Sequence, residues 1–274
     1  MQQYESAYID LIKLVEKYGY SSSGRNGDTI AVNGWMLQFP ATPFPILQGR
    51  KIYHEGVVGE LATFLEGPRD LQHFKDNGCN FWDKWADENG KLTLDYGNVW
   101  KNAGLIFSKK RVKKCNQLKE VVENITVDPH SRRHIITGWV PSHAWGGWLS
   151  LPCCHYSYQF IVRHSYLDLI WIQRSADLMV GVPSNMISAT LLLHLMAQTT
   201  GYKVGTVSMQ LGNVHIYHDH LPKIPAYREQ ANEVMYSPAK ISISKNATVF
   251  NFSPSDFAMV KYEHAEPISF NLHE

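Results

Sequence analysis

The sequence predicts an α+β fold, a single domain over residues 1–274 in which helices pack on a mixed, mainly antiparallel sheet. Helical periodicity marks the first part of the chain, and three strand-like runs follow one another between residues 134 and 174. A buried helix then leads into a further strand. A chain of 274 residues with 44% hydrophobic side chains can bury one large core, and no linker-like segment divides it.

Three amphipathic helices are predicted before residue 130. The first runs from Tyr4 to a stop at Gly19, because its apolar residues recur at helical spacing. The second covers residues 54–65 and carries Glu60. The third is predicted over residues 109–125, with its lysines on the face opposite to its apolar side chains.

Strands are predicted where alternation or short apolar runs replace the helical period. An alternating segment covers residues 29–38, after a flexible, turn-rich loop at 21–27 that carries Arg25. A turn is expected at 128–133, and a largely buried helix is predicted over 185–199. The remaining strand-like runs are 134–139, 155–163, 167–174, 203–211, 241–243, 249–252 and 257–262, of which the first three are expected to be neighbours in one sheet.

Charge and hydropathy exclude two classes of binding. The 26 Lys and Arg residues nearly balance the 25 Asp and Glu residues, giving a net charge of +1. Bulk electrostatic binding of nucleic acid or of an anionic membrane is therefore not expected. The longest uncharged stretch, residues 178–202, is broken by Pro183 and by polar residues and does not resemble a membrane span.

The N-terminus and the cysteines favour a reducing compartment. The first residues lack the basic and apolar regions of a secretory signal, so a cytoplasmic location is expected. Four cysteines (Cys79, Cys115, Cys153 and Cys154) are too few for a disulfide scaffold, so free thiols are expected. Cys79 and Cys115 lie in helix-like stretches, where a buried and inert thiol is the simplest interpretation.

Arginines stand at three separate loop positions: Arg25, the pair Arg132-Arg133, and Arg174, which Ser175 follows. Guanidinium groups match phosphate oxygens, so together they indicate an anion site, although each arginine alone is typical of a weak surface ion pair. A cysteine beside such arginines would have its thiolate favoured and could act as a nucleophile near neutral pH. No C-x-x-C pair or H-E-x-x-H helix is present, so no metal site is predicted.

Several segments together resemble the thymidylate synthase family. Residues 151–160 (LPCCHYSYQF) are similar to its nucleophile segment, 173–177 (QRSAD) and 181–185 (GVPSN) to its phosphate and base segment, and 212–217 (GNVHIY) to its sugar segment. Further matches are 128–133, 82–90, and Phe44-Pro45 leading to Glu60. They follow the order of the family and extend from Tyr4 to about Tyr217, and the tail resembles it least.

The resemblance implies a reaction that begins at a cysteine. In this family a thiolate adds to C6 of a pyrimidine nucleotide, and C5 then attacks 5,10-methylenetetrahydrofolate. Cys154 matches that cysteine. The resemblance implies two further catalytic residues: Glu60, which would relay protons through water, and Tyr96. Cys153 stands where the family usually has a proline, which implies a less rigid loop.

The resemblance also implies residues for both substrates. Asn185 would accept N3–H of uracil and donate to O4, which favours dUMP over dCMP; an asparagine that caps the helix is the alternative. Arg132 and Arg133 would reach the phosphate bound by the other subunit of a homodimer. The implied nucleotide residues are Arg25, Arg132, Arg133, Arg174, Ser175, Asp177, Asn185, His215 and Tyr217, and the implied folate residues are Trp82, Trp85, Leu151 and Asp177.

Departures from the family bear on the product. Ser184 stands in place of a phenylalanine, Tyr53 in place of a histidine and Asn213 in place of an aspartate, and residues 268–274 lack the short apolar ending. A wetter folate side favours hydroxymethylation of dUMP, because water would then reach the intermediate before hydride. The alternatives are thymidylate synthesis by reductive methylation, hydroxymethylation of dCMP, and a non-catalytic nucleotide-binding protein.

Overall fold

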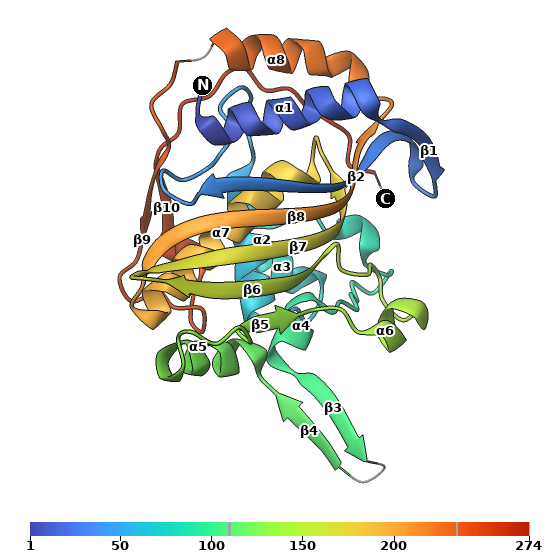
Figure 1. Cartoon of the computed structure of the whole chain (residues 1–274). Coiled ribbons are helices and arrows are strands. Elements are labelled where there is room, and N and C mark those ends of the chain that lie inside the picture. The colour runs from blue at the N-terminus through green and yellow to red at the C-terminus, as the bar shows by residue number, and fades with distance from the viewer. Residues whose placement is uncertain (109–110, 234, 274) are drawn as a thin grey trace.

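A six-stranded sheet forms the centre of the molecule (Figure 1). The structure, a computed structural model, describes residues 1–108, 111–233 and 235–273, and only the backbone at 104–108 and 111–113. In sheet order the strands are β1 (Tyr20–Gly24), β2 (Gly27–Pro40), β8 (Lys203–Tyr217), β7 (Tyr166–Asp177), β6 (His155–Arg163) and β5 (Ile135–Thr137). Because β7 and β8 are parallel and the other neighbours antiparallel, the predicted mixed, mainly antiparallel sheet is confirmed.

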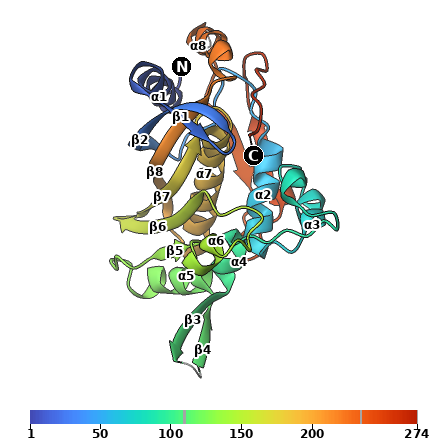
Figure 2. The same ribbon diagram turned by 90° about the vertical axis from the view of Figure 1, so that its right-hand side faces the viewer.

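One face of the sheet is covered by helices (Figure 2). The crossover that the parallel pair β7 and β8 requires is α7 (Gly181–Thr200), which is buried on nearly all sides because its sequence is apolar on all sides. Helix α2 (His54–Glu66) packs on α7, and α1 (Gln3–Tyr18) packs on β2. Further helices are α3 (Leu71–Asp76), α4 (Tyr96–Lys101), α5 (Gln117–Val127), α6 (Pro141–Trp145) and α8 (Ile224–Glu233), with 3-10 turns η1 (Asp83–Trp85), η2 (Leu221–Lys223) and η3 (Pro254–Asp256).

Two further pairs of strands lie outside the central sheet. β3 (Ala103–Ser108) and β4 (Arg111–Cys115) form a hairpin that projects from the body of the molecule (Figure 1). β9 (Lys240–Ile243) pairs with β10 (Phe257–Lys261), which confirms the predicted runs at 241–243 and 257–262.

The helix predicted over 109–125 is wrong in its first part. The backbone from Arg111 to Cys115 is a strand, and the helix begins only at Gln117, where the Asn116 side chain accepts a hydrogen bond from the Lys119 N–H at 3.1 Å. This asparagine caps the N-terminus, and the apolar spacing upstream of it belongs to the hairpin. Residues 109 and 110, where the predicted helix begins, lie outside the described residues.

Other local predictions also change. Residues 21–27 are a hairpin rather than a flexible loop, since Gly24 of β1 pairs with Gly27 of β2. Residues 249–251 form a turn, where the Asn251 side chain accepts from the Thr248 N–H at 2.7 Å, and not a strand. Helix α7 begins at Gly181, four residues before the predicted start, so Asn185 lies inside the helix and does not cap it.

The cysteines and the apolar segments agree with the sequence in part. All four cysteines are free thiols, as predicted. Cys79 is buried, as predicted, but it lies after the end of α3. Cys115 is half-buried and is the last residue of β4, so neither cysteine lies in a helix and only Cys79 is buried. Across the described part of the chain, the structure has no helix both long and apolar enough to cross a membrane.

Candidate active site

A cavity of about 250 Å³ opens where β7 and β8 end. Because these strands are parallel, their carboxyl ends share one edge of the sheet, where Asp177 pairs with His215. The predicted residues that line the cavity are Glu60, Trp82, Trp85, Tyr96, Leu151, Cys154, Ser175, Asp177, Asn185, His215 and Tyr217. The fold thus brings together catalytic, base, sugar and folate candidates that lie far apart in the sequence; their individual roles remain predictions.

Cys154 stands immediately before β6, with its side chain on the cavity wall. The Arg174 guanidinium donates to the carbonyls of Cys153 at 3.0 Å and Pro152 at 2.9 Å, which places its Nη2 4.0 Å from the Cys154 sulfur. From α4, the Tyr96 hydroxyl accepts the Cys154 backbone N–H at 2.9 Å. The nucleophile loop is therefore held by one arginine and one tyrosine.

The Cys154 thiol is harder to ionise than the sequence suggested. Burial raises its pKa, and the positive charge of Arg174 and a hydrogen bond from Tyr96 lower it by less. The prediction that neighbouring arginines favour the thiolate is thus right about the direction of the Arg174 effect. Burial outweighs that effect in this structure.

Cys153 belongs to the core and not to the cavity. It is 1% exposed, and a Cβ at Gly138 would lie 3.6 Å from its sulfur. Burial raises the pKa of the Cys153 thiol to about 12, so it is protonated at neutral pH. Of the two adjacent cysteines, only Cys154 lines the cavity.

Glu60 projects from α2 into the cavity. The Trp82 indole N–H donates to its Oε1 at 2.9 Å. Burial raises the pKa of Glu60 to about 7, and the bond from Trp82 opposes the shift. A carboxyl group with this pKa can both give and take a proton near neutral pH.

The first turns of α7 present Ser184 and Asn185 to the cavity. Among the described residues, none forms a hydrogen bond with the Asn185 side-chain amide, so its donor and acceptor are available to a ligand. Asp177 Oδ1 accepts the backbone N–H groups of Met179 at 2.9 Å and Val180 at 3.2 Å, which fixes the entry into α7. Asp177 therefore has a structural role beside its predicted ligand role.

His215 and Tyr217 lie at the end of β8, with ring centroids 5.3 Å apart and planes at 89°. Burial lowers the pKa of His215, which keeps its imidazole neutral. Its Nδ1–H donates to the Asn213 Oδ1 at 3.0 Å, and the Asn213 amide donates to Asn33. Asn213 is not a cavity-lining residue, so the expectation that this departure lies on the folate side is wrong; Asn213 orients His215 from outside.

Four predicted phosphate ligands lie outside the cavity lining. The Arg25 Nε donates to the Asn26 side chain at 3.0 Å in the β1–β2 turn, and Arg174 lies on the nucleophile loop. Arg132 and Arg133 are exposed ahead of β5. The chain by itself therefore brings Arg174 close to the nucleophile, but it does not bring the Arg132-Arg133 pair to the cavity.

Several lining residues were not predicted from the sequence, among them Asn26, Phe81, Leu272 and His273. Asn26 follows Arg25, so the predicted phosphate loop contained the signal for it. Phe81 precedes Trp82, and its ring packs edge-on against Tyr53 at 6.0 Å. The tail residues had no local signal, because only the three-dimensional path of the chain brings them to the cavity.

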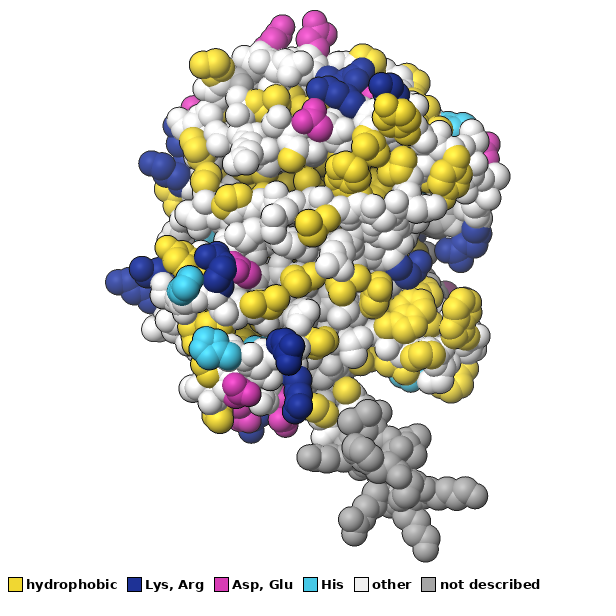
Figure 3. Space-filling view, viewed as in Figure 1, with side chains coloured by type: hydrophobic (Ala, Val, Ile, Leu, Met, Phe, Trp, Pro, Cys, Tyr) yellow, Lys and Arg dark blue, Asp and Glu magenta, His cyan; other side chains and the backbone are white. Residues whose placement is uncertain are grey.

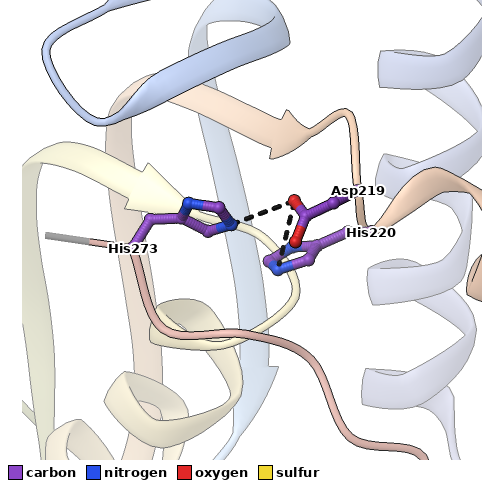
Figure 4. A group of neighbouring side chains, drawn as sticks. All are labelled: Asp219, His220 and His273. Atoms are coloured by element: carbon purple, nitrogen blue, oxygen red, sulfur yellow. Dashed lines mark hydrogen bonds and ion pairs between the residues drawn. The ribbon is translucent and has the colours of Figure 1, made fainter.

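Asp219, His220 and His273 form a cluster beside the cavity, with one potential metal-ligand atom from each within 4.8 Å of the others (Figure 4). Hydrogen bonds already use these atoms: His273 Nε2 lies 2.9 Å from Asp219 Oδ1, and His220 Nε2 donates to the Asn271 carbonyl at 2.9 Å. An ion would have to displace the second bond, so the geometry favours a hydrogen-bonded contact between the tail and the turn after β8.

Comparison with known proteins agrees with this geometry. The thymidylate synthase family model matches residues 6–273. A thymidylate synthase from Vesicomyosocius okutanii subsp. Calyptogena okutanii (strain HA) is 33% identical over 264 residues, which is 95% of this chain and 97% of that protein. The similarity thus includes the tail, which the sequence segments left out.

Proposed function

This chain belongs to the thymidylate synthase family of methylenetetrahydrofolate-dependent one-carbon transferases, and we propose that it converts dUMP to 5-hydroxymethyl-dUMP. The observation that best supports one-carbon chemistry is that Cys154, Glu60 and Asn185 line the same cavity, where the side-chain amide of Asn185 is available to a ligand. Each of these three groups can act on a different part of a pyrimidine ring.

The proposed reaction begins when the Cys154 sulfur adds to C6 of the base. Arg174 stabilises the thiolate, and Tyr96 holds the backbone of the nucleophile in place. Glu60, with a pKa of about 7, exchanges a proton with the base through water as negative charge develops at C5 and at the O4 oxygen. Methylenetetrahydrofolate, when bound, supplies the carbon that becomes attached to C5.

The folate would lie against an apolar wall. Trp82 and Trp85 have ring centroids 5.6 Å apart, and Leu151 and Phe81 line the same cavity. Such a surface fits the flat pterin ring system, and the Asp177 carboxylate is the polar group that we assign to its amino groups. The residues present therefore fit this cosubstrate.

Asn185 supports uracil as the base. An amide supplies one acceptor for N3–H and one donor for O4, whereas cytosine presents the opposite pattern at these two positions. The side chain is 9% exposed, so a mismatched base would leave a buried polar group unpaired. We therefore assign dUMP, and not dCMP, as the nucleotide.

Ser184 supports hydroxymethylation. Its hydroxyl donates to the Val180 carbonyl at 3.2 Å and lines the cavity at a place where the family commonly has a phenylalanine. The smaller, polar side chain leaves room for water beside C5, where water would add to the exocyclic carbon and leave a hydroxymethyl group. Methylation is the second candidate; it is supported by the name of the relative and by Leu272, an apolar tail residue on the cavity wall.

We also propose a homodimer that uses the uncovered face of the sheet. Gln38, Ser208, Ile170, Gln159 and Ile135 form a row in register across β2, β8, β7, β6 and β5. Met36 on β2 and Ile161 on β6 are exposed and lie on the same side of the sheet as this row, because each is two residues from a member of it. Figure 3 shows apolar side chains scattered over the face in view. Packing two copies through this face would bury them and bring the Arg132-Arg133 pair at its edge toward the partner.

Mixing the protein with dUMP and methylenetetrahydrofolate tests the assignment. Hydroxymethylation gives a nucleotide heavier than dUMP by one carbon, one oxygen and two hydrogens, without the absorbance change of dihydrofolate. Methylation gives one dihydrofolate for each dTMP, which would overturn the hydroxymethylase assignment. No turnover, with dUMP bound, would support a non-catalytic nucleotide-binding protein. The Cys154→Ser variant is the control for background chemistry.

A further inference from the structure

The last residues of the chain are fastened to the turn after β8. Lys223 donates to the Ser269 carbonyl at 2.7 Å and His220 to the Asn271 carbonyl at 2.9 Å. The Phe270 ring lies 5.2 Å from that of His220 and 4.9 Å from the Arg50 guanidinium carbon. These contacts bring Leu272 and His273 to the cavity, and Figure 1 shows the C-terminus near the ends of β2 and β8.

A single carboxylate holds two side chains of this tail. Asp219 Oδ1 lies 2.9 Å from His273 Nε2, and Oδ2 accepts the Asn271 amide at 2.8 Å (Figure 4). Because a carboxylate only accepts hydrogen bonds, Nε2–H of His273 donates to Asp219. Asp219 therefore fixes the position and the orientation of the His273 ring.

His273 covers the ring of Tyr217. The two rings stack with centroids 3.8 Å apart and planes at 15°. His215 and His220 meet the same tyrosine ring edge-on, at 5.3 and 5.6 Å. Three imidazoles thus hold Tyr217, and the one from the tail is the only one of the three that can leave without unfolding β8 or the turn that follows it.

The β1–β2 turn closes on the same place. A Cβ at Gly27, whose φ is +125°, would lie 3.8 Å from the Tyr217 ring and 4.0 Å from His273 Nδ1. The turn that carries Arg25 and Asn26 therefore comes close to the sugar residue and the tail, and Asn26, Tyr217 and His273 line the same cavity. This junction joins three segments: residues 25–27, Tyr217 and residues 271–273.

We propose that His273, oriented by Asp219, is a positioning residue for the nucleotide, which it serves by fixing Tyr217 and closing the sugar end of the cavity against the β1–β2 turn. The inference rests on the proposed function, because it takes dUMP as the ligand. It places the effect of the tail on the nucleotide, whereas a tail that only covers the folate would leave nucleotide binding unchanged.

Calorimetry with dUMP alone tests the inference without turnover. His273→Ala removes the stacked ring and is expected to raise the Kd for dUMP about fivefold to tenfold, while His273→Phe, which keeps the stack, should restore most of the affinity. Asp219→Ala should weaken binding similarly, and the double variant should be no weaker than His273→Ala, because both changes break one arrangement. His218→Ala, an exposed neighbour, is the matched control and should bind as the wild type does.

The KM for methylenetetrahydrofolate at saturating dUMP separates the two roles of the tail. If His273 acts on the nucleotide, the KM for methylenetetrahydrofolate should change less than twofold in His273→Ala. An unchanged dUMP Kd with a raised folate KM would overturn the inference and leave the proposed function standing. Additive effects of the two substitutions would also overturn it. If the wild-type chain did not bind dUMP, the proposed function and the inference would both fail.

Discussion

The indole N–H of Trp82 donates to Glu60 Oε1 across 2.9 Å, so a residue assigned to the folate wall also orients the proton-relay carboxyl. The two side chains come from different segments, since Glu60 lies on α2 and Trp82 precedes η1. The proposed folate contact and the proposed proton transfer are thus linked through one hydrogen bond. Any movement of Trp82 on folate binding would change the environment of the carboxyl.

Glu60→Gln should lower turnover at least about a hundredfold, because an amide cannot exchange the proton. Binding of dUMP, measured by calorimetry, should change little, since the substitution keeps the shape and the bond from Trp82. Glu55→Gln is the control on the same helix, where the carboxylate is exposed. Turnover within tenfold of wild type would remove Glu60 from the proposed mechanism.

The same substitution should change how stability depends on pH. The pKa of Glu60 is raised from 4.5 to about 7, so the folded protein holds this proton more tightly than the unfolded chain. Protonation of Glu60 contributes to the free energy of unfolding in full below pH 4.5, and this contribution is lost as the pH rises to about 7. Glu60→Gln should therefore be the more stable protein at pH 8, by at most about 3 kcal/mol, with the difference vanishing near pH 4.5. Urea unfolding at both pH values measures it, and a constant difference would contradict the assignment.

The two adjacent cysteines should behave oppositely. Cys154→Ser should abolish turnover and any covalent nucleotide adduct seen by mass spectrometry, because an alcohol is a far weaker nucleophile. Cys153→Ser should keep turnover within about tenfold while lowering the free energy of unfolding by about 1–3 kcal/mol, since it buries a hydroxyl. The reverse pattern would mean that Cys153 is the nucleophile.

Mixing two inactive variants tests the arginine pair. If Arg132 and Arg133 act across a homodimer, combining Cys154→Ser with the double variant Arg132→Ala, Arg133→Ala should create one complete site in each mixed dimer. Random exchange of subunits would then recover about a quarter of the wild-type activity. The matched control combines Cys154→Ser with Arg174→Ala, because Arg174 contacts the nucleophile loop of its own chain. Recovery no greater than either parent would place the arginines outside the partner's site.

Asn185→Asp should change the base preference. An ionised carboxylate cannot donate to O4 of uracil but can accept from the amino group of cytosine, so kcat/KM for dUMP should fall about a hundredfold relative to that for dCMP. Asn213→Asp makes the same change outside the cavity and should leave the ratio unchanged. Equal losses for both nucleotides with Asn185→Asp would show that this residue does not select the base.

Local patterns predicted the elements that carry their own signals. The α1 and α2 periodicities, with their glycine ends, match the structure closely because each helix buries one face and stops at a residue suited to leave it. The helix predicted over the lysine-rich segment was wrong in its first part because the apolar spacing there fits a helix as well as a strand. Only Asn116 marked the true start of α5. The prediction that Asn185 caps a helix was wrong because α7 begins four residues earlier, at Gly181.

In the candidate site, too, residues within recognisable segments were predicted and residues placed only by the fold were not. Resemblance supplied Cys154, Glu60 and Asn185 because each lies in a recognisable segment, and the cavity brings them together. His273 could not be found in this way, since its contacts with Asp219 and Tyr217 depend on the path of the tail in three dimensions. Burial of the Cys154 thiol could not be predicted either, because a sequence shows neighbouring charges but not the atoms that surround a side chain in the fold.

Ser184 offers the sharpest test of the product. Ser184→Phe fills the space beside the folate wall with an apolar ring, which should exclude water from the exocyclic carbon and give hydride transfer more time. The yield of dihydrofolate per modified nucleotide should rise at least severalfold, as measured by absorbance against product mass. Ser184→Ala is the control, because it removes the hydroxyl without filling the space, and it should keep hydroxymethyl-dUMP as the main product. If the phenylalanine variant kept the wild-type ratio of products, water access at this position would not decide the outcome, and the polar tail around His273 would be the next place to test.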